Sequence, residues 1–135
     1  MSEQNIALLR DAYSAFGRGD VPAVLGAFAD DIEWHEAEGM PYGGLHRGPQ
    51  AVAENVFGPV VEDIDEFSVT PEEFYTGGDE VLVIVRYAGK GRATGKELDL
   101  QAVHAWTVRD GKLARCRQFA DATVFNAVLA VEATA

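Results

Sequence analysis

The stretch AFGRGDVPAVLGAFADDIEWHE, residues 15–36, decides the fold of this chain. It predicts the end of one helix, a glycine turn, a second helix and a first strand. Apolar residues recur at helical spacing over residues 3–17, which predicts the first helix. Asp20 is a favoured N-cap residue, and the apolar stripe from Val21 to Phe28 predicts a second, shorter helix behind it.

The segment DIEWHE, residues 31–36, alternates in polarity and predicts a strand. Successive strand residues point to opposite faces, so Trp34 and Glu36 share one face. A loop rich in glycine and proline follows. Pro49 suits the first turn of a third helix, in which Gly58-Pro59 predicts a break or a kink.

The second half of the chain consists of alternating segments that predict strands over residues 67–75, 80–90, part of 92–104, 101–109 and 112–121. Turn residues separate these segments at Gly77-Gly78-Asp79, Thr94-Gly95-Lys96 and Asp110-Gly111. Short turns between neighbours indicate antiparallel pairing. Residues 1–135 therefore predict one α+β domain, in which a curved antiparallel sheet forms a cone around three N-terminal helices. Residues 122–132 would add a short helix or a disordered tail.

The composition sets limits on partners and location. The chain holds 22 acidic and 11 basic residues, a formal net charge of −11, which argues against nucleic acid as its main partner. No apolar run reaches the roughly 20 residues of a membrane span, and the N-terminus lacks the pattern of a secretory signal. We therefore expect a cytoplasmic protein with no membrane partner. Cys116, the only cysteine, is expected in the core or at an interface.

Three segments resemble one group of proteins. Residues 15–36 are similar to the opening of SnoaL-like and ketosteroid isomerase-like proteins, MPYGGLHRGPQAV to the loop before their third helix, and VHAWTVRDGKLARCRQFAD to their last hairpin. The resemblance covers nearly the whole chain and implies the cone-shaped fold of the nuclear transport factor 2-like superfamily. That superfamily includes isomerases, polyketide cyclases, epoxide hydrolases, dehydratases and binding domains, so the fold leaves the activity open.

Three polar residues are candidates for acid–base catalysis. By the resemblance, Glu36 falls where the ketosteroid isomerases have their catalytic carboxylate, and burial beside Trp34 would raise its pKa toward the range of a general base. The resemblance places His104 near the oxyanion-stabilising acid of the isomerases and near a catalytic histidine of the cyclases. Asp121 resembles the terminal aspartate that serves as the base in those cyclases.

Each candidate also has a structural alternative that the sequence leaves open. Glu36 could be an exposed residue at a strand end, and His104 could be a core histidine that a backbone carbonyl satisfies. Asp121 could cap a final helix. Alternation groups Asp121 with Arg117 and Phe119, and a neighbouring arginine would lower the pKa of the aspartate and weaken it as a base.

Several side chains are candidates for binding a ligand. Flat, amphipathic rings would suit an aromatic or polycyclic compound, and they are supplied by Tyr13, Trp34, Tyr42 and Trp106. Phe119 is a further candidate for ligand binding. An inward-facing Arg86 or Arg117 could bind a ligand carboxylate. His35 and Glu36 are adjacent on a strand and point to opposite faces, so they cannot chelate one metal ion. We expect neither a metal nor a cofactor.

The favoured function is cofactor-free acid–base chemistry on a small apolar or aromatic carbonyl compound. Glu36 or Asp121 would remove a proton beside the carbonyl and His104 would stabilise the enolate, as in an isomerase or a cyclase. An epoxide hydrolase is one alternative, and it requires Arg86 or Arg117 between two inward acids. A non-catalytic ligand-binding or dimerisation module is the other, and it would show a pocket whose polar groups are all paired.

A homodimer is expected through the outer face of the sheet, because such a face is left partly uncovered in a small α+β cone. Alternation suggests that this face is formed by Val81, Val83, Val85, Val103, Ala105 and Cys116.

Overall fold

The structure is a computed structural model that describes residues 2–129. Its elements follow in the order α1 (Ser2–Gly17), α2 (Val21–Gly26), β1 (Phe28–His35), β2 (Leu45–Arg47), α3 (Pro49–Val52), η1 (Ala53–Phe57), α4 (Gly58–Asp63), β3 (Ile64–Gly77), β4 (Glu80–Gly91), β5 (Glu97–Arg109), β6 (Lys112–Phe119) and α5 (Ala122–Leu129). Helices come first and the long strands follow, which confirms the α+β class.

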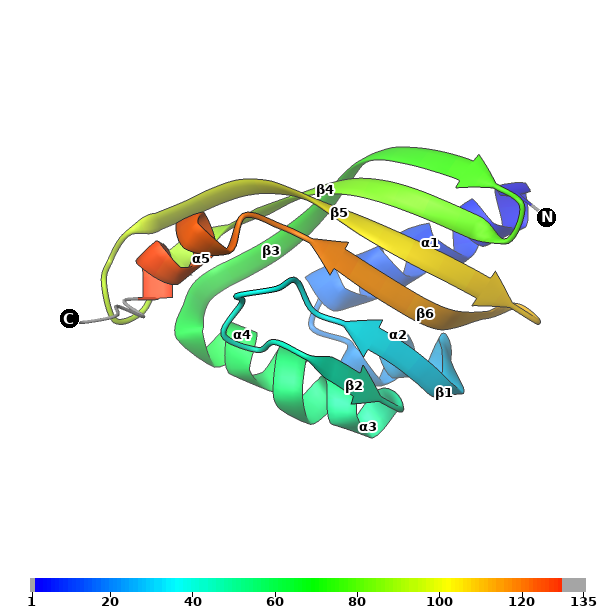
Figure 1. Cartoon of the computed structure of the whole chain (residues 1–135), viewed down its shortest axis with the longest axis horizontal. Helices are drawn as coiled ribbons and strands as arrows, with labels where there is room; N and C mark the ends of the chain where they lie inside the picture. Colours follow the sequence, from blue (N-terminus) through cyan, green and yellow to red (C-terminus); the bar gives the residue numbers. More distant parts are fainter. Residues whose placement is uncertain (1, 130–135) are drawn as a thin grey trace.

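One curved sheet carries the strands in the order β2-β1-β6-β5-β4-β3 (Figure 1). Every neighbouring pair is antiparallel except β1 and β6, which run parallel. The curved antiparallel sheet was predicted, but the parallel pair was not, because β1 is far from β6 in sequence and pairs with it only after the meander of β3 to β6 is complete. Helix α1 crosses the concave face, and the helical segment 49–63 packs below it (Figure 1).

Two local predictions about helices need correction. Helix α2 ends at Gly26, and Phe28 opens β1 instead of extending the helix. Residues 49–63 stay helical throughout, so of the predicted break or kink at Gly58-Pro59 the break does not occur. The turn before these residues is the π-helix η1, since Pro59 has no N–H to donate and the hydrogen-bond pattern shifts locally.

The hairpin turns occur where the sequence predicts them. Asp110 and Gly111 both have positive φ, 54° and 73°, as the two central residues of a type I′ turn require. The two overlapping predictions over 92–109 form a single strand, β5. The predicted C-terminal helix is α5, and residues 130–132 of that prediction lie outside the described residues.

Strands β3 and β4 bend together where they approach α5. The register shifts in β3 between Asp65 and Ser68, opposite Gly89, whose φ is 149°. A Cβ atom on Gly89 would lie 2.5 Å from Cγ2 of Ile64, so only glycine allows the two strands to come this close. The bend curls the sheet over the helices and closes one side of the core.

The core lies between the helices and the concave face of the sheet. Phe28, Trp34 and Trp106 are all buried there, as the sequence predicts. Their rings pack edge to face or tilted against one another and against Phe57, with centroids about 6 Å apart. Within residues 2–129, none of the helices combines the length and hydrophobicity of a membrane span.

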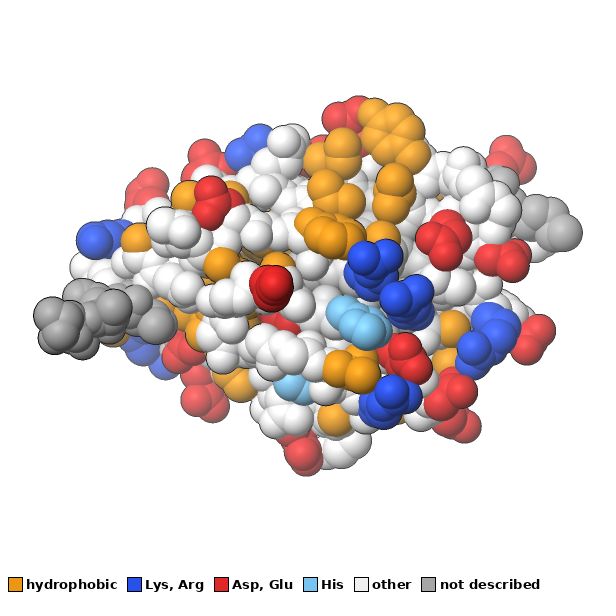
Figure 2. All heavy atoms as spheres, in the orientation of Figure 1, with side chains coloured by type: hydrophobic (Ala, Val, Ile, Leu, Met, Phe, Trp, Pro, Cys, Tyr) orange, Lys and Arg blue, Asp and Glu red, His pale blue; other side chains and the backbone are white. Residues whose placement is uncertain are grey.

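The predicted membership of the outer face was wrong for four of its six residues. Val81, Val83, Val85 and Cys116 are fully buried in the core. The register explains the error, because Val83 pairs directly with the buried His104 and paired residues share a face. Val103 and Ala105 do lie on the outer face, beside the exposed side chains of Tyr75, Leu82 and Phe119. Figure 2 shows hydrophobic side chains gathered there; dimerisation through this face stays a prediction.

Candidate functional site

A cavity of about 70 Å³ lies between the helices and the concave face of the sheet. Its walls are mostly aromatic and aliphatic, with contributions from α1, the helical segment 49–63, α5 and the strands. The polar side chains among its lining residues are Tyr13, Trp34, Glu36, Tyr42, Tyr87, His104, Trp106 and Gln118. A few polar groups within apolar walls are typical of a small-molecule site.

The strand register brings Glu36, Gln118 and His104 into one row across β1, β6 and β5. Cys116 of β6 pairs with both Trp34 of β1 and Trp106 of β5, and this row points into the core. Two residues further along, Gln118 pairs with His104 on the same face. Glu36 continues the inward phase of Trp34 one residue beyond the end of β1. Sequence alternation therefore predicted the facing of Glu36 and His104 correctly, and the strand order places Gln118 of β6 between them.

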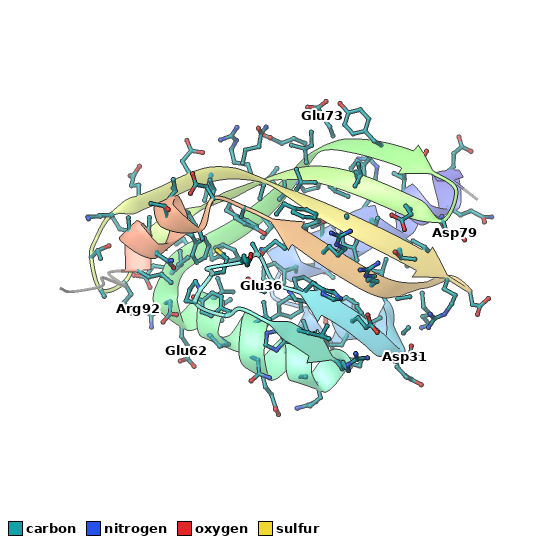
Figure 3. The ribbon with its side chains drawn as sticks, in the orientation of Figure 1. Asp31, Glu36, Glu62, Glu73, Asp79 and Arg92 are labelled. Carbon is teal, nitrogen blue, oxygen red and sulfur yellow. The ribbon has the colours of Figure 1, made fainter. Side chains whose placement is uncertain are left out.

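Glu36 is a buried carboxylate at the cavity wall. Its side chain points inward from the end of β1, whereas Asp31 on the same strand points outward (Figure 3). The indole Nε1–H of Trp34 donates to Oε1 of Glu36 at 2.6 Å. Burial raises the pKa of Glu36 to about 7, although the Trp34 bond acts in the opposite direction. A carboxylate that titrates near neutral pH can both accept and return a proton.

His104 is 4% exposed and is held between two tyrosines. The hydroxyl of Tyr13 lies 2.7 Å from Nδ1, and the hydroxyl of Tyr87 lies 2.6 Å from Nε2. Burial lowers the pKa of His104 to about 3, so the imidazole is neutral at physiological pH. Both ring nitrogens are occupied by tyrosines, which corrects the expectation that His104 itself would donate to a ligand oxygen.

The hydrogen-bonded chain extends beyond both tyrosines. The Nε1–H of Trp106 donates to the Tyr13 hydroxyl at 2.9 Å. The side-chain amide of Gln118 donates to the Tyr87 hydroxyl. The backbone N–H of Ala37 donates to Oε1 of Gln118 at 3.3 Å, which fixes the amide so that its NH₂ group faces Tyr87. We call the chain Trp106–Tyr13–His104–Tyr87–Gln118 the tyrosine relay.

Sequence reasoning missed Tyr87 and Gln118. Both occupy inward positions, Tyr87 in phase with Val83 and Val85 on β4, and Gln118 in phase with Cys116 on β6. The available signal was a polar residue at an inward position of each strand. That signal depends on knowing which face is inward, and alternation alone suggested the outer face for Val83, Val85 and Cys116.

Tyr42 lies in the segment between β1 and β2 and covers part of the cavity. Its hydroxyl donates to Oδ2 of Asp63 at 2.7 Å, and its ring contacts Phe125 of α5 at a centroid distance of 6.1 Å. Burial, and then the Asp63 carboxylate, raise the pKa of Tyr42 above its usual range. Tyr42 thus ties the segment 36–44 to the end of α4 as an uncharged hydroxyl.

Three predicted site residues lie outside the cavity. Asp121 is exposed, and its Oδ1 accepts from the backbone N–H groups of Thr123 at 3.0 Å and Val124 at 3.4 Å. It therefore caps α5, the alternative that the sequence left open. Arg117 and Phe119 are exposed on the outer face, with the guanidinium 5.2 Å from the ring centroid. The structure gives none of the three a place in the cavity wall.

The arginine test for the hydrolase alternative has a clear result. Arg86 does lie between two acids, Glu72 at 3.0 Å and Asp99 at 2.7 Å, but all three are on the solvent side of the sheet. Neither Arg86 nor Arg117 is among the residues that line the cavity. Within residues 2–129 no group of three His, Cys, Asp or Glu side chains is placed to hold a metal ion.

The sheet, the covering helices and the internal cavity define an NTF2-like fold. An NTF2-like protein from Burkholderia thailandensis has a TM-score of 0.85 and 31% identity to this chain, covering 90% of this chain and 94% of its own. An NTF2-like protein of unknown function from Burkholderia pseudomallei has a TM-score of 0.86 and 29% identity, covering 93% and 97%. TerC, co-crystallised with polyporic acid, has a TM-score of 0.86 and 28% identity, covering 94% and 98%. Residues 9–116 match the SnoaL-like domain, and the chain belongs to this family.

Proposed function

We propose that this protein carries out cofactor-free acid–base catalysis on a small apolar or aromatic carbonyl compound, of the isomerase or cyclase type. The observation that carries the proposal is the Glu36 carboxylate, with a pKa of about 7, in an aromatic cavity that also contains the tyrosine relay. A base poised near neutral pH beside hydrogen-bond donors is what proton abstraction next to a carbonyl requires.

The chemistry begins with transfer of one proton to Glu36. The ionised carboxylate takes a proton from the carbon next to the carbonyl, the C–H electron pair moves into the C–C bond, and the carbonyl oxygen becomes an enolate oxygen. Glu36 is then a neutral carboxylic acid. It can return the proton to another carbon of the enolate, which is isomerisation. Alternatively the enolate carbon attacks a second carbonyl, and Glu36 returns the proton to the alkoxide that forms, which is cyclisation.

The surroundings favour this step in two ways. Aromatic walls exclude water from the enolate, which strengthens each polar interaction within the cavity. The tyrosine hydroxyls are uncharged donors because burial raises the pKa of both Tyr13 and Tyr87 well above the usual range. A hydroxyl that resists ionisation can donate to an enolate oxygen without losing its own proton.

The size of the cavity limits the substrate. A volume of about 70 Å³ is well below the roughly 300–1,000 Å³ of pockets for drug-sized ligands. The cavity volume therefore favours a small carbonyl compound, and a ring of the size of benzene, which a cavity of about 150 Å³ holds, would need the lining to move. Membership in the SnoaL-like family and the likeness to TerC, a protein co-crystallised with polyporic acid, support a small organic ligand.

Exchange of carbon-bound hydrogen in D₂O tests the proposal. Cyclopentanone is incubated with the protein, and incorporation of deuterium next to the carbonyl is followed by NMR. We expect exchange above the buffer rate at pH 8 and its loss in Glu36→Gln. If wild-type protein and buffer give the same rate with cyclopentanone and with acetophenone, while both ketones bind, the non-catalytic binding module becomes the better account.

A further inference from the structure

The tyrosine relay holds one hydrogen more than its internal bonds can use. Its two end bonds are supplied by the indole N–H of Trp106 and by the amide of Gln118. The two inner bonds, from His104 to Tyr13 and to Tyr87, need two hydrogens. Three are available, one on each hydroxyl and one on the neutral imidazole. One tyrosine must therefore direct its hydroxyl hydrogen out of the relay.

The tautomer of His104 decides which tyrosine has the spare hydrogen. If Nε2 carries the proton, it donates to Tyr87, Tyr13 donates to Nδ1, and the Tyr87 hydrogen is spare. If Nδ1 carries the proton, the Tyr13 hydrogen is spare. Both tyrosines line the cavity, so in either case the spare hydrogen is available to a ligand there.

The position of Glu36 favours Tyr87. The Glu36 carboxylate contributes to raising the pKa of Tyr87, and it is not among the groups that act on the pKa of Tyr13. An ionised carboxylate attracts the positive end of a nearby O–H dipole, so it stabilises the tautomer in which the Tyr87 hydrogen is free. The backbone links the two groups further, because Ala37, next to Glu36, anchors the Gln118 amide that donates to Tyr87.

We infer that the relay is a binding subsite for one ligand oxygen, to which Tyr87 donates the spare hydrogen, and that His104 is a positioning residue that selects Tyr87 through its Nε2–H tautomer. The ligand class is a neutral or anionic compound with an acceptor oxygen, such as a ketone, enolate or phenol, set within an apolar body. The inference rests on the proposed function only in taking the cavity as the ligand site.

NMR of the histidine ring nitrogens tests the tautomer without any ligand. In ¹⁵N-histidine-labelled protein at pH 8, we expect His104 as the Nε2–H form. Tyr13→Phe should keep that form, since Nε2–H still has Tyr87 as acceptor. Tyr87→Phe should switch it to Nδ1–H, because a buried N–H without an acceptor is costly and Tyr13 remains to accept. A wild-type Nδ1–H form, which needs no variant to observe, overturns the assignment to Tyr87.

Binding of phenol and toluene tests the ligand class, since the two differ in one hydroxyl. A cavity that holds benzene has a volume of about 150 Å³, so binding of either probe also requires some movement of the lining. We expect wild type and Tyr13→Phe to bind phenol roughly five to ten times more tightly than toluene. Tyr87→Phe should lose most of this preference, because its spare hydrogen moves to Tyr13 on α1, at another part of the cavity wall.

The two readouts separate this inference from the proposed function. The Tyr87 subsite is overturned if the preference for phenol over toluene is the same in wild type, Tyr13→Phe and Tyr87→Phe, or if only Tyr13→Phe loses it. This holds even if cyclopentanone exchanges its hydrogens. Absence of hydrogen exchange together with the expected tautomers and ratios overturns the catalytic proposal and leaves the subsite supported. Thermal unfolding of each variant establishes that a lost preference is measured on folded protein.

Discussion

The ends of the parallel strands β1 and β6 carry one carboxylate each, and the two carboxylates have opposite surroundings. Glu36 follows β1 by one residue and is 9% exposed, with an indole donor and a pKa of about 7. Asp121 follows β6 by two residues, is exposed and accepts from the first backbone N–H groups of α5. The strands end on the same edge of the sheet, but Glu36 continues an inward phase and Asp121 an outward one.

This contrast shows that the identity of a residue at a strand end does not determine its chemistry. An inward carboxylate is desolvated by aromatic rings, which raises its pKa and makes it a base near neutral pH. An outward carboxylate stays hydrated and serves local backbone geometry. The same division applies across the whole sheet, with the relay on the concave face and exposed apolar side chains on the other.

The largest expected effect is on the exchange of the carbon-bound hydrogens of cyclopentanone with D₂O. Glu36→Gln should lower the exchange rate of cyclopentanone at pH 8 at least about 100-fold, because the amide has no lone pair basic enough to take the proton. Asp121→Asn, the matched change at the other strand end, should stay within about twofold of wild type. Equal losses in the two variants would contradict the division of roles between the strand ends.

Acid stability should separate the two buried titrating groups. The pKa of Glu36 is raised to about 7 in the folded protein, so the folded state takes up a proton before the unfolded state does. Titration of Glu36 therefore increases the free energy of unfolding as pH falls toward the unfolded pKa near 4.5. The folded pKa of His104 is lowered to about 3, so its contribution is complete above the unfolded value of 6.5 and is lost as pH falls below it. Each contribution amounts to about 3 kcal/mol between pH 8 and 4.5, with opposite sign.

We therefore expect these two contributions nearly to cancel in the wild type and not in Glu36→Gln. The variant should lose about 3 kcal/mol of unfolding free energy relative to wild type between pH 8 and 4.5. Urea unfolding at several pH values measures the difference, and comparing the two proteins at each pH removes the effect of the other charges. Parallel pH dependences in the two proteins would show that Glu36 does not titrate as the cavity predicts.

The hydrogen bond from Trp34 to Glu36 tunes the base. The bond stabilises the ionised carboxylate, so Trp34→Phe should raise the pKa of Glu36 and move the rise of the exchange rate by about one unit to higher pH. Trp106→Phe is the matched control, since the Trp106 indole donates to Tyr13 instead. A shift of the profile in the control and none in Trp34→Phe would assign the titration to another group.

At the other strand end, the role of Asp121 should be visible in stability alone. Asp121→Ala removes the acceptor for the N–H groups of Thr123 and Val124, so the free energy of unfolding should fall by about 1 kcal/mol. Asp121→Asn retains a side-chain acceptor and should be nearly neutral. If Asp121→Ala changed the exchange of the carbon-bound hydrogens of cyclopentanone and left the stability unchanged, Asp121 would belong to the site and not to the helix cap.

The outer face should affect association and leave the cavity unchanged. We predict a homodimer through the apolar group that includes Tyr75, Leu82 and Phe119, all of which are about half exposed in the single chain. Leu82→Glu should shift sedimentation from dimer to monomer at micromolar concentration, with exchange of cyclopentanone within about twofold. A wild-type monomer under these conditions would contradict the prediction.

The sequence by itself determined the local features of this protein. Apolar spacing and turn residues predicted α1 and the hairpins, and the resemblance of residues 15–36 and of the last hairpin predicted the SnoaL-like family, which residues 9–116 confirm. Alternation also placed Glu36 with Trp34, and His104 with Trp106, on inward faces. These features depend on neighbours within a few positions, so their signal is contained in short segments.

Only the tertiary structure decided which strands are neighbours and which face of each is inward. The parallel pairing of β1 with β6 brings Glu36 close to Gln118, and the β4–β5 register turns Val83 and Tyr87 inward. Alternation has a period of two and fixes a face only relative to its own strand, so a wrong choice reverses every residue, as it did for Val81 to Val85. The proton count of the relay depends on contacts between residues up to 93 positions apart, which short-range patterns do not contain.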